Sequence, residues 1–506
     1  MTSPNPVLPG WHPDPSICRV DNSFYLVTST FAFYPGLPIY RSSDLHHWDL
    51  IGHALIDESW PSLGPVDVSD GIWAATIRHA DGVFYIVFTV AAGRTGAGLY
   101  VTTATRPEGP WSSPRQLDGD GIDPSLFFDD DGKVFLTAAR DATSPHASGP
   151  GEIWMRQFDP SAGALIGPTF ILWHGAATGT WVEAPHLYKR DGAYHLICAE
   201  GGTERNHAVT AARATEITGP YRTDPRSPLL THRHLGDHAT VQNVGHADIV
   251  DGSDGRSWAV VLGVRPIDGH HTLGRETFVV PVQWSRTGPV FAPGEGRIVE
   301  GAAPAGRAPS SEDWISLRGP VEAEVAEQRI VLTPRPAPLD SAESPAFLGV
   351  RQDHHMGSFE AGIDTDEIIA HEAGLAALQG SGARLTASLV RRDTGVVLRA
   401  THAQQSGSTL LGELAVSGHV RVGIRMTETH YAVTAATSDR HDIVARLPRT
   451  SLSTETAGGF VGVTLGIFNI AAGDASPIAF HTVRYCRGTE GANSQSGLAH
   501  PMASLA

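Results

Sequence analysis

The sequence predicts an all-β protein in which a five-bladed β-propeller is followed by a β-sandwich. Three observations lead to this prediction: a repeated strand–turn–strand unit within residues 1–298, little helical periodicity in that region, and a change of pattern after residue 312. The repeat is clearest at residues 181–194, where Glu183 precedes an apolar run, an Asp-Gly turn and an aromatic residue. Asp-Gly between two apolar runs is a strong signal for a β-hairpin.

The same unit occurs five times, about once every 60 residues, and a repeat of that length with several strands per unit indicates propeller blades. The innermost strand of each blade lines the axis, so the first residues of the five copies are expected to converge there. Four of these five first residues are ionisable, which makes the axis the place to search for chemistry. The copies begin at Asp14, Ala74, Asp123, Glu183 and His246.

Three of the converging residues are carboxylates: Asp14, Asp123 and Glu183. A single aspartate before proline often only starts a turn. Three carboxylates at one position of a repeat repel one another, and a protein that tolerates this repulsion usually has a functional site there. The sequence therefore predicts an acidic site at one end of the propeller axis.

The second half of the chain follows a different pattern. Residues 299–312 are rich in Ala, Pro and Gly and are predicted to be a linker. Residues 313–488 contain alternating apolar and polar runs without the blade motif, for example at 384–390, and predict a sandwich. The small, polar tail at 489–506 is expected to be disordered.

Composition limits the class of function. The chain has 506 residues, 41% hydrophobic and 18% charged, which is typical of a globular protein. A net charge of −17 disfavours nucleic acid and anionic membranes as partners. No apolar run is long enough to span a membrane, and no signal peptide is visible at the start, so we expect a cytoplasmic enzyme. Three scattered cysteines show no metal spacing, and the oligomeric state stays open, a homo-oligomer included.

Paired carboxylates suit glycoside hydrolysis, in which one group donates a proton and the other activates water. Glu183 lies among Trp181, Val182 and Ala184, an apolar setting that favours its protonated form. Asp14 lies between two prolines, which would hold a general base rigidly. Asp123 is then a third carboxylate whose negative charge would raise the pKa of the acid. Phe31 and Trp73 are candidate sugar platforms, although either aromatic residue alone would more often be core.

Several motifs resemble family 43 of the glycoside hydrolases, in its β-xylosidase and α-L-arabinofuranosidase branch. The resemblance covers nearly the whole chain, because the second domain is similar to the concanavalin-like β-sandwich appended to these enzymes. The motifs are Trp11-His12-Pro13-Asp14-Pro15-Ser16, Ser29-Thr30-Phe31, Gly121-Ile122-Asp123-Pro124-Ser125, Glu183-Ala184-Pro185-His186-Leu187-Tyr188-Lys189, Gly245-His246-Ala247-Asp248 and Leu273-Gly274-Arg275-Glu276-Thr277-Phe278, with Gly349-Val350-Arg351-Gln352 in the second domain.

The resemblance implies an inverting mechanism and a role for each residue. Asp14 would be the general base, Glu183 the general acid and Asp123 the residue that tunes the pKa of Glu183. His246 would lie on the axis beside water or a calcium ion, of which it would be one ligand; no other cofactor is implied. Ala184 departs from the Gly that many relatives carry. The sugar pocket would be lined by Phe31, Trp73, Thr203, Arg275 and His246.

Four functions remain to be weighed. The favoured one is release of xylose from the non-reducing end of β-1,4-xylo-oligosaccharides. The second is α-L-arabinofuranosidase activity on arabinoxylan or arabinan fragments, alone or as a dual activity. A non-catalytic carbohydrate-binding propeller would be expected to lack at least one of the three carboxylates. Fructan-hydrolysing propellers use an Asn-Asp-Pro-Asn-Gly motif, which differs from the motif around Asp14. The sandwich is expected to close the pocket, with residues 460–469 as the candidate segment.

Overall fold

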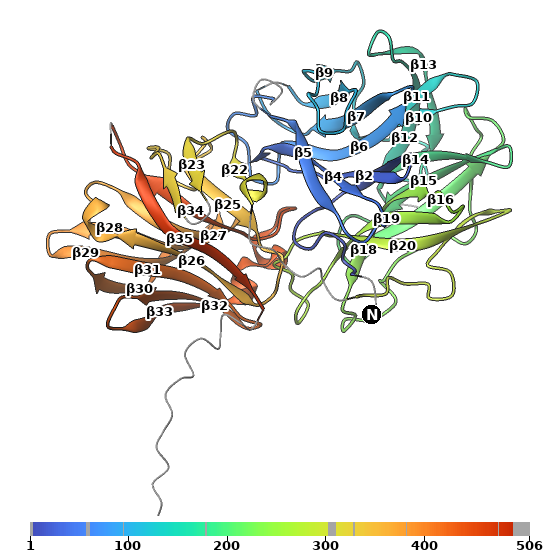
Figure 1. Ribbon diagram of the computed structural model, residues 1–506. Coiled ribbons are helices and arrows are strands. Elements are labelled where there is room, and N and C mark those ends of the chain that lie inside the picture. The colour runs from blue at the N-terminus through green and yellow to red at the C-terminus, as the bar shows by residue number, and fades with distance from the viewer. Residues whose placement is uncertain are drawn as a thin grey trace, which may run out of the picture.

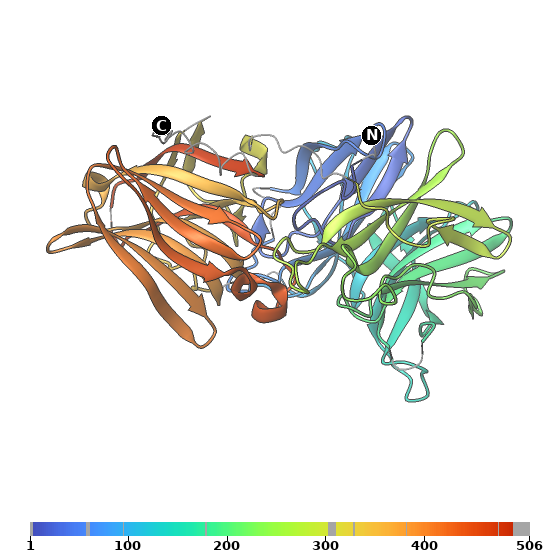
Figure 2. The ribbon, with the colours of Figure 1, turned by 90° about the horizontal axis from the view of Figure 1, so that it is seen from below.

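A computed structural model describes residues 4–56, 61–94, 96–177, 180–301, 310–326, 329–380, 382–473 and 475–488. Most of these residues form strands, and their one α-helix is the single turn α1 (Thr454–Ala457). Two β-rich bodies lie side by side, with the chain passing from the blue-to-green body to the orange-and-red one (Figures 1 and 2). No helix among the described residues has the length and apolarity needed to cross a membrane.

The first body confirms the predicted five-bladed propeller, since its described residues form five antiparallel sheets of four strands each. The first two blades are β1 (Ser16–Val20), β2 (Ser23–Val27), β4 (Gly36–Ser42) and β5 (Asp49–Leu55), and then β6 (Ile72–Ala80), β7 (Val83–Val90), β8 (Gly98–Ala104) and β9 (Arg115–Gln116). The third blade is β10 (Ile122–Phe128), β11 (Val134–Asp141), β12 (Gly151–Asp159) and β13 (Ala164–Trp173). The last two are β14 (Val182–Arg190), β15 (Ala193–Glu200), β16 (Ala208–Ala214) and β17 (Arg222–Thr223), and then β18 (Gln242–Asp251), β19 (Ser257–Val264), β20 (Glu276–Ser285) and β21 (Gly288–Phe291).

The hairpin that revealed the repeat forms as expected. Arg190 of β14 pairs with Ala193 of β15, so Asp191 and Gly192 make a two-residue turn. Both turn residues have positive φ, at 49° and 71°. Positive φ at both central positions suits the right-handed twist of the two strands, which is why Asp-Gly is favoured there.

The apolar core of the propeller lies between neighbouring blades. Each pair of adjacent blades shares one cluster of buried side chains, such as Leu126 and Leu136 of the third blade packed with Val87 of the second. The ring is closed near the start of the chain, where Leu8 forms a bridge with Thr277 of the fifth blade. Blades buried on both faces explain why β15 is apolar along nearly its whole length.

The second body confirms the predicted sandwich of two antiparallel sheets. The cluster between the sheets contains Phe359, Leu375 and Ile467. One sheet has the order β23 (Ala323–Ala326), β24 (Arg329–Leu332), β35 (Ile478–Arg487), β26 (Gly357–Asp364), β31 (His419–Met426), β32 (His430–Ala436) and β33 (His441–Pro448). The other has the order β25 (Phe347–Arg351), β34 (Thr464–Ile470), β27 (Glu372–Gly380), β28 (Ala383–Arg392), β29 (Gly395–Gln404) and β30 (Gly407–Val416).

The two bodies are joined by backbone pairing, packing and an ion pair. Strand β22 (Ser316–Leu317) pairs with β3 (Phe33–Tyr34) of the propeller. Trp11 of the propeller shares a buried cluster with Phe347 and Val461 of the sandwich. The imidazole of His271 lies 2.6 Å from the Glu455 carboxylate of α1. The predicted linker ends in the 3-10 turn Ser311–Asp313; residues 302–309 and the tail at 489–506 lie outside the described residues.

Candidate active site

Each blade has a residue in the left-handed region at an equivalent position near the site, within its innermost strand or, for Asp14, just before it. In four of the five strands this residue lies at an irregularity in the pairing with the next strand, as between Ile122 and Ser125. Positive φ is costly for a residue with a side chain and persists where the surrounding structure holds it, often at functional sites. The five residues are Asp14 (φ 55°), Ala74 (31°), Asp123 (54°), Ala184 (52°) and His246 (49°).

This backbone feature corrects the predicted register of the fourth copy. The residue equivalent to Asp14 and Asp123 is Ala184, and Glu183 stands one position earlier. The spacing along the chain predicts three carboxylates at one repeat position, but the structure places two there, Asp14 and Asp123. Because neighbouring residues of a strand point in opposite directions, an offset of one lets Glu183 enter the site from a different direction than the two aspartates.

A cavity of about 250 Å³ lies at this end of the axis, and all eight predicted site residues line it. Six further residues complete its wall. The predicted residues are Asp14, Phe31, Trp73, Asp123, Glu183, Thr203, His246 and Arg275; the others are Ala74, Ile122, Gly202, Glu204, His207 and Phe460. The fold thus gathers residues from every blade and from the sandwich around one small space.

Asp14 is held as an anion. Arg275 Nη1 donates to its Oδ1 at 2.8 Å, and Ser29 Oγ donates to its Oδ2 at 2.7 Å. Burial opposes ionisation of this carboxyl, but Arg275, His246 and the Ser29 hydrogen bond outweigh it and lower the pKa of Asp14 below its usual value. Ser29 Oγ also accepts the Ala74 N–H at 2.7 Å, which ties Asp14 to the second blade. A fixed, ionised carboxylate is suited to remove a proton from water.

The pKa values of Glu183 and Asp123, unlike that of Asp14, are raised. Burial, followed by the charge of Asp14, raises the pKa of Glu183 to about 7. Burial and the charges of Glu183 and Asp14 raise the pKa of Asp123 well above its usual value. Asp123 Oδ2 accepts the Ala184 N–H at 3.0 Å, which links it to the residue after Glu183. Four carboxyl groups, that of Glu204 included, line the cavity with one arginine, and Arg275 contacts Asp14; of Asp14, Asp123 and Glu183, the last two therefore hold protons to higher pH than Asp14.

Aromatic rings form the apolar wall of the cavity. Phe460 of the sandwich stacks on Phe31 with ring centroids 6.4 Å apart and meets the edge of Trp73 at 5.6 Å. The Arg275 guanidinium lies 5.7 Å from the Phe31 ring centre and 5.4 Å from that of Phe460. Ser69 links Trp73 of the propeller to Phe460 of the sandwich, because its carbonyl accepts the Trp73 Nε1–H and its hydroxyl accepts the Phe460 N–H. An apolar, aromatic wall of this kind suits one face of a sugar ring.

Two buried histidines complete the axial side. His246 Nδ1 lies 3.7 Å from Asp14 Oδ1, and burial lowers the His246 pKa, so its ring is neutral. His207 is 1% exposed, its Nδ1 faces the Asn243 carbonyl at 3.0 Å, and its Nε2 has no partner among the described residues. The His207 ring packs where the β-carbon of any residue larger than glycine would stand at position 245, which explains Gly245.

Several residues of the cavity wall carry no signal in the sequence that marks their role. Ser29 and Ile122 stand inside the motifs that carried the family resemblance, so their positions were visible but their contacts were not. His207 and Glu204 belong to the loop between β15 and β16, where no local pattern distinguishes them. Phe460 begins the candidate segment 460–469, and the structure identifies it as the residue of that segment that lines the cavity.

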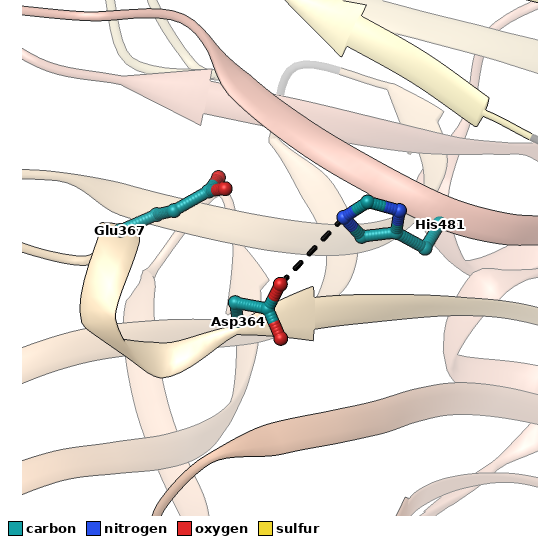
Figure 3. Close-up of side chains that lie close together, drawn as sticks. All are labelled: Asp364, Glu367 and His481. Atoms are coloured by element: carbon teal, nitrogen blue, oxygen red, sulfur yellow. Dashed lines mark ion pairs between the residues drawn. The ribbon is translucent and has the colours of Figure 1, made fainter.

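Residues of the types that bind metals gather elsewhere. Among the described residues, Asp364, Glu367 and His481 bring one potential ligand atom each within 4.8 Å of the others. They lie in the sandwich, and Figure 3 shows His481 facing Asp364, whose carboxylate is 3.7 Å from the imidazole Nε2. Asp364 also pairs with His419 at 2.8 Å, and Glu367 accepts the Ala479 N–H. These residues are absent from the wall of the catalytic cavity.

A larger hollow of about 550 Å³ lies on the other side of the loop at 201–206. The one carboxylate in its described wall, Glu200, accepts hydrogen bonds from Ala176 N, Ala177 N, Thr180 Oγ1 and Thr210 Oγ1. A carboxylate engaged in this way stabilises a loop. The smaller cavity, with its differently protonated carboxyl groups, is therefore the candidate active site.

Comparison with known families and proteins agrees with this geometry. Residues 3–290 match the family Glycosyl hydrolases family 43, and residues 307–486 match the Beta xylosidase C-terminal Concanavalin A-like domain. A protein of Butyrivibrio fibrisolvens named Xylosidase/arabinosidase is 36% identical over 93% of this chain and 96% of its own. The Non-reducing end alpha-L-arabinofuranosidase BoGH43B of Bacteroides ovatus is 33% identical over 93% of this chain and 92% of its own. A crystal structure described as xylan beta-1,4-xylosidase from Bacillus halodurans aligns with a TM-score of 0.87, 29% identity, and coverage of 96% of this chain and 100% of that one.

Proposed function

Because the chain belongs to glycosyl hydrolase family 43, whose enzymes are inverting glycosidases, we propose that it releases xylose from the non-reducing end of β-1,4-xylo-oligosaccharides. The observation that carries the proposal is a small cavity lined by both an arginine-bound Asp14 and Glu183, a buried carboxyl whose pKa is raised to about 7. Inversion needs this pairing of an ionised base with a protonated acid.

The reaction takes place in one displacement. Glu183 donates its proton to the glycosidic oxygen as the bond from that oxygen to the anomeric carbon breaks. Asp14 removes a proton from water, whose oxygen attacks the anomeric carbon from the opposite face. The products are a sugar of inverted configuration and the shortened chain, with Asp14 protonated and Glu183 ionised until solvent restores both. This mechanism requires the two carboxyl groups to lie roughly 6.5–9.5 Å apart.

The shape of the cavity favours removal of one terminal sugar. Its volume of about 250 Å³ is smaller than the roughly 300–1,000 Å³ of pockets for drug-sized ligands. Phe460 brings the sandwich to the wall, so the propeller face is not an open groove at this point. A pocket that holds one pentose ring and is closed on one side suits an exo-acting enzyme.

A second candidate is the release of α-L-arabinofuranose from arabinoxylan or arabinan fragments. Its support comes from the relatives, since one is named for both activities and another for arabinofuranosidase alone. Xylopyranose and arabinofuranose can present similar groups to one pocket, so a dual activity is compatible with the same residues.

Paired 4-nitrophenyl β-D-xylopyranoside and α-L-arabinofuranoside substrates test the choice. We expect a higher kcat/KM on the xyloside and stepwise loss of single xylose units from xylotetraose. A higher kcat/KM on the arabinofuranoside would favour the second candidate. Asp14→Asn serves as the inactive control. Binding of xylo-oligosaccharide without hydrolysis of either substrate would contradict both and indicate a carbohydrate-binding propeller.

For the axial position we propose ordered water rather than calcium beside His246. Calcium takes six to eight oxygen ligands. The carboxylate nearest to His246, Asp14, is already bound by Arg275, and the Asp248 carboxylate deeper on the axis is bound by Arg78. The donor set around this neutral imidazole therefore fits a hydrogen-bonded water better than a divalent ion.

A further inference from the structure

We infer that a buried polar layer behind the cavity, centred on the Arg78–Asp248 pair, positions the catalytic carboxyl groups relative to one another. This inference rests on the proposed glycosidase function and assigns residues that do not touch the substrate. The layer consists of the residues two positions after the left-handed residue of each blade, joined by Arg78 and Tyr188. Its repeat members are Ser16, Thr76, Ser125, His186 and Asp248, of which none is more than 4% exposed.

Asp248 is the centre of this layer, which we call the axial layer. It is fully buried and accepts five hydrogen bonds from three other blades. Ser16 Oγ donates to Oδ2 at 2.7 Å and the Ile17 N–H donates to the same oxygen at 3.0 Å. Tyr188 Oη donates to Oδ1 at 2.6 Å while accepting the Ile249 N–H. Although burial opposes ionisation, Arg78 and these donors hold the pKa of Asp248 below its usual range.

Arg78 joins the blades through both of its terminal nitrogens. Nη1 and Nη2 donate to the two oxygens of Asp248 at 2.8 and 3.0 Å, a bidentate pair with a defined geometry. Nη2 also donates to His186 Nδ1 at 3.0 Å. Ser125 Oγ lies 2.9 Å from the same imidazole nitrogen. Burial lowers the pKa of His186 to about 3, so the ring is neutral and the single lone pair of Nδ1 is shared between Arg78 and Ser125.

The axial layer thus contains side chains from every blade, and its hydrogen bonds join all five: four blades meet at Asp248, and Ser125 joins the third blade through His186. In the chain, Ser16 lies two residues after Asp14, Ser125 two after Asp123, and His186 three after Glu183. Each of these three stretches contains the left-handed residue of its blade, Asp14, Asp123 or Ala184, and this constrained backbone leaves the carboxyl group little freedom to move independently of the axial layer. Rotation of one blade would displace its carboxyl group, and the shared bonds to Asp248 and Arg78 resist that rotation.

The consequence concerns the rate of the chemical step. Water must fit between Asp14 and the sugar while Glu183 reaches the glycosidic oxygen, so the separation of two residues from different blades decides the reaction. A displacement of about 1 Å in such an arrangement costs roughly 100-fold in rate. The axial layer is therefore expected to govern kcat more than substrate binding.

Arg78→Lys tests this inference, because it keeps the charge but cannot form the two parallel bonds. Arg140→Lys is the matched control. Arg140, on β11 of the third blade, donates to the buried Glu152 and to Asp120, both at 2.9 Å, and it belongs neither to the axial layer nor to the cavity wall. We expect Arg78→Lys to lower kcat about 100-fold with little change in KM, as for lost positioning in the transition state. Its pH profile of kcat/KM should also shift on the alkaline limb, because the Asp14–Glu183 spacing affects the pKa of Glu183.

Folding is monitored by circular dichroism and thermal unfolding of each full-length variant. If Arg78→Lys does not fold, Tyr188→Phe removes one bond of the axial layer, with Tyr194→Phe as its control, since Tyr194 Oη bonds Asp129 at 2.6 Å outside the axial layer. A folded axial variant with the kcat and pH profile of its control overturns the inference. A wild-type protein without activity on xyloside or arabinofuranoside would instead contradict the proposed function.

Discussion

Replacing Arg275 with methionine should move both limbs of the pH–activity profile to higher pH. Arg275 is 9% exposed and donates to Asp14 Oδ1 at 2.8 Å, with a second contact to Oδ2 at 3.5 Å. Its charge lowers the pKa of Asp14 and also that of Glu183. The acid limb reports ionisation of the base and the alkaline limb deprotonation of the acid. Without the guanidinium, both carboxyl groups hold their protons to higher pH.

The size of the shift follows from the contacts. A hydrogen bond to a charged group contributes about 1.5–3 kcal/mol, and one pKa unit corresponds to about 1.4 kcal/mol. Because Asp14 is buried, solvent screens this interaction little, and its limb should rise by about 1–2 units. The charge of Arg275 lowers the pKa of Glu183 through space, without a hydrogen bond between the two side chains. The alkaline limb should therefore rise by less than the acid limb. Burial and the remaining charges are unchanged by the substitution.

The assay is kcat/KM for a nitrophenyl glycoside from pH 4 to 9, which reports the pKa values of the free enzyme. Arg275→Lys should give a smaller shift than Arg275→Met, since it retains the charge in a different geometry. Arg140→Met, at a position that does not line the cavity, is the control and should leave both limbs in place. Loss of rate at all pH values is compatible with the reasoning, since only the limb positions test it. An acid limb that stays in place, or moves to lower pH, in Arg275→Met would refute it.

Further predictions concern the acid, the pocket wall, the axis and the domain contact. Glu183→Ala should lower kcat far more on xylobiose than on an aryl glycoside, whose leaving group needs no proton. With the wild-type enzyme, NMR of the released sugar should show the inverted anomer first, and initial retention of configuration would contradict the mechanism. Phe460→Ala should raise KM for xylobiose roughly 5- to 10-fold by removing about 1 kcal/mol of ring contact, as checked by steady-state kinetics. Treatment with EDTA should leave activity unchanged, while loss of activity restored by calcium would place an ion beside His246. Glu455→Gln should lower the unfolding midpoint near pH 7. Although burial opposes ionisation, His271 lowers the pKa of Glu455, so the stabilisation from this contact is fully present above about pH 4.3 and disappears as the pH falls through the lowered pKa. The unfolding midpoints of the variant and the wild type should therefore converge in acid.

Local patterns in the sequence were sufficient to predict the blades and their hairpins. Asp-Gly turns such as Asp191-Gly192 and two-sided apolar strands such as β15 are set by backbone preference and burial over a few residues. The repeat then brought the first residues of the copies together, because equivalent positions of a propeller meet at its axis. Asp14, Asp123, Glu183 and His246 line one cavity for this reason, whereas Thr203 and Arg275, which line it too, were implied by the family resemblance.

The tertiary structure decided the features that depend on contacts between distant residues. The left-handed backbone at Ala184 offsets Glu183 by one position, and spacing along the chain did not reveal this offset. Phe460 reaches the wall only because the sandwich docks on the propeller, and Arg78 meets Asp248 across the axis. The electrostatic states of Asp14 and Glu183 likewise follow from which carboxyl group contacts Arg275. A sequence pattern records short-range preference, whereas these features arise from packing of side chains that are tens to hundreds of residues apart.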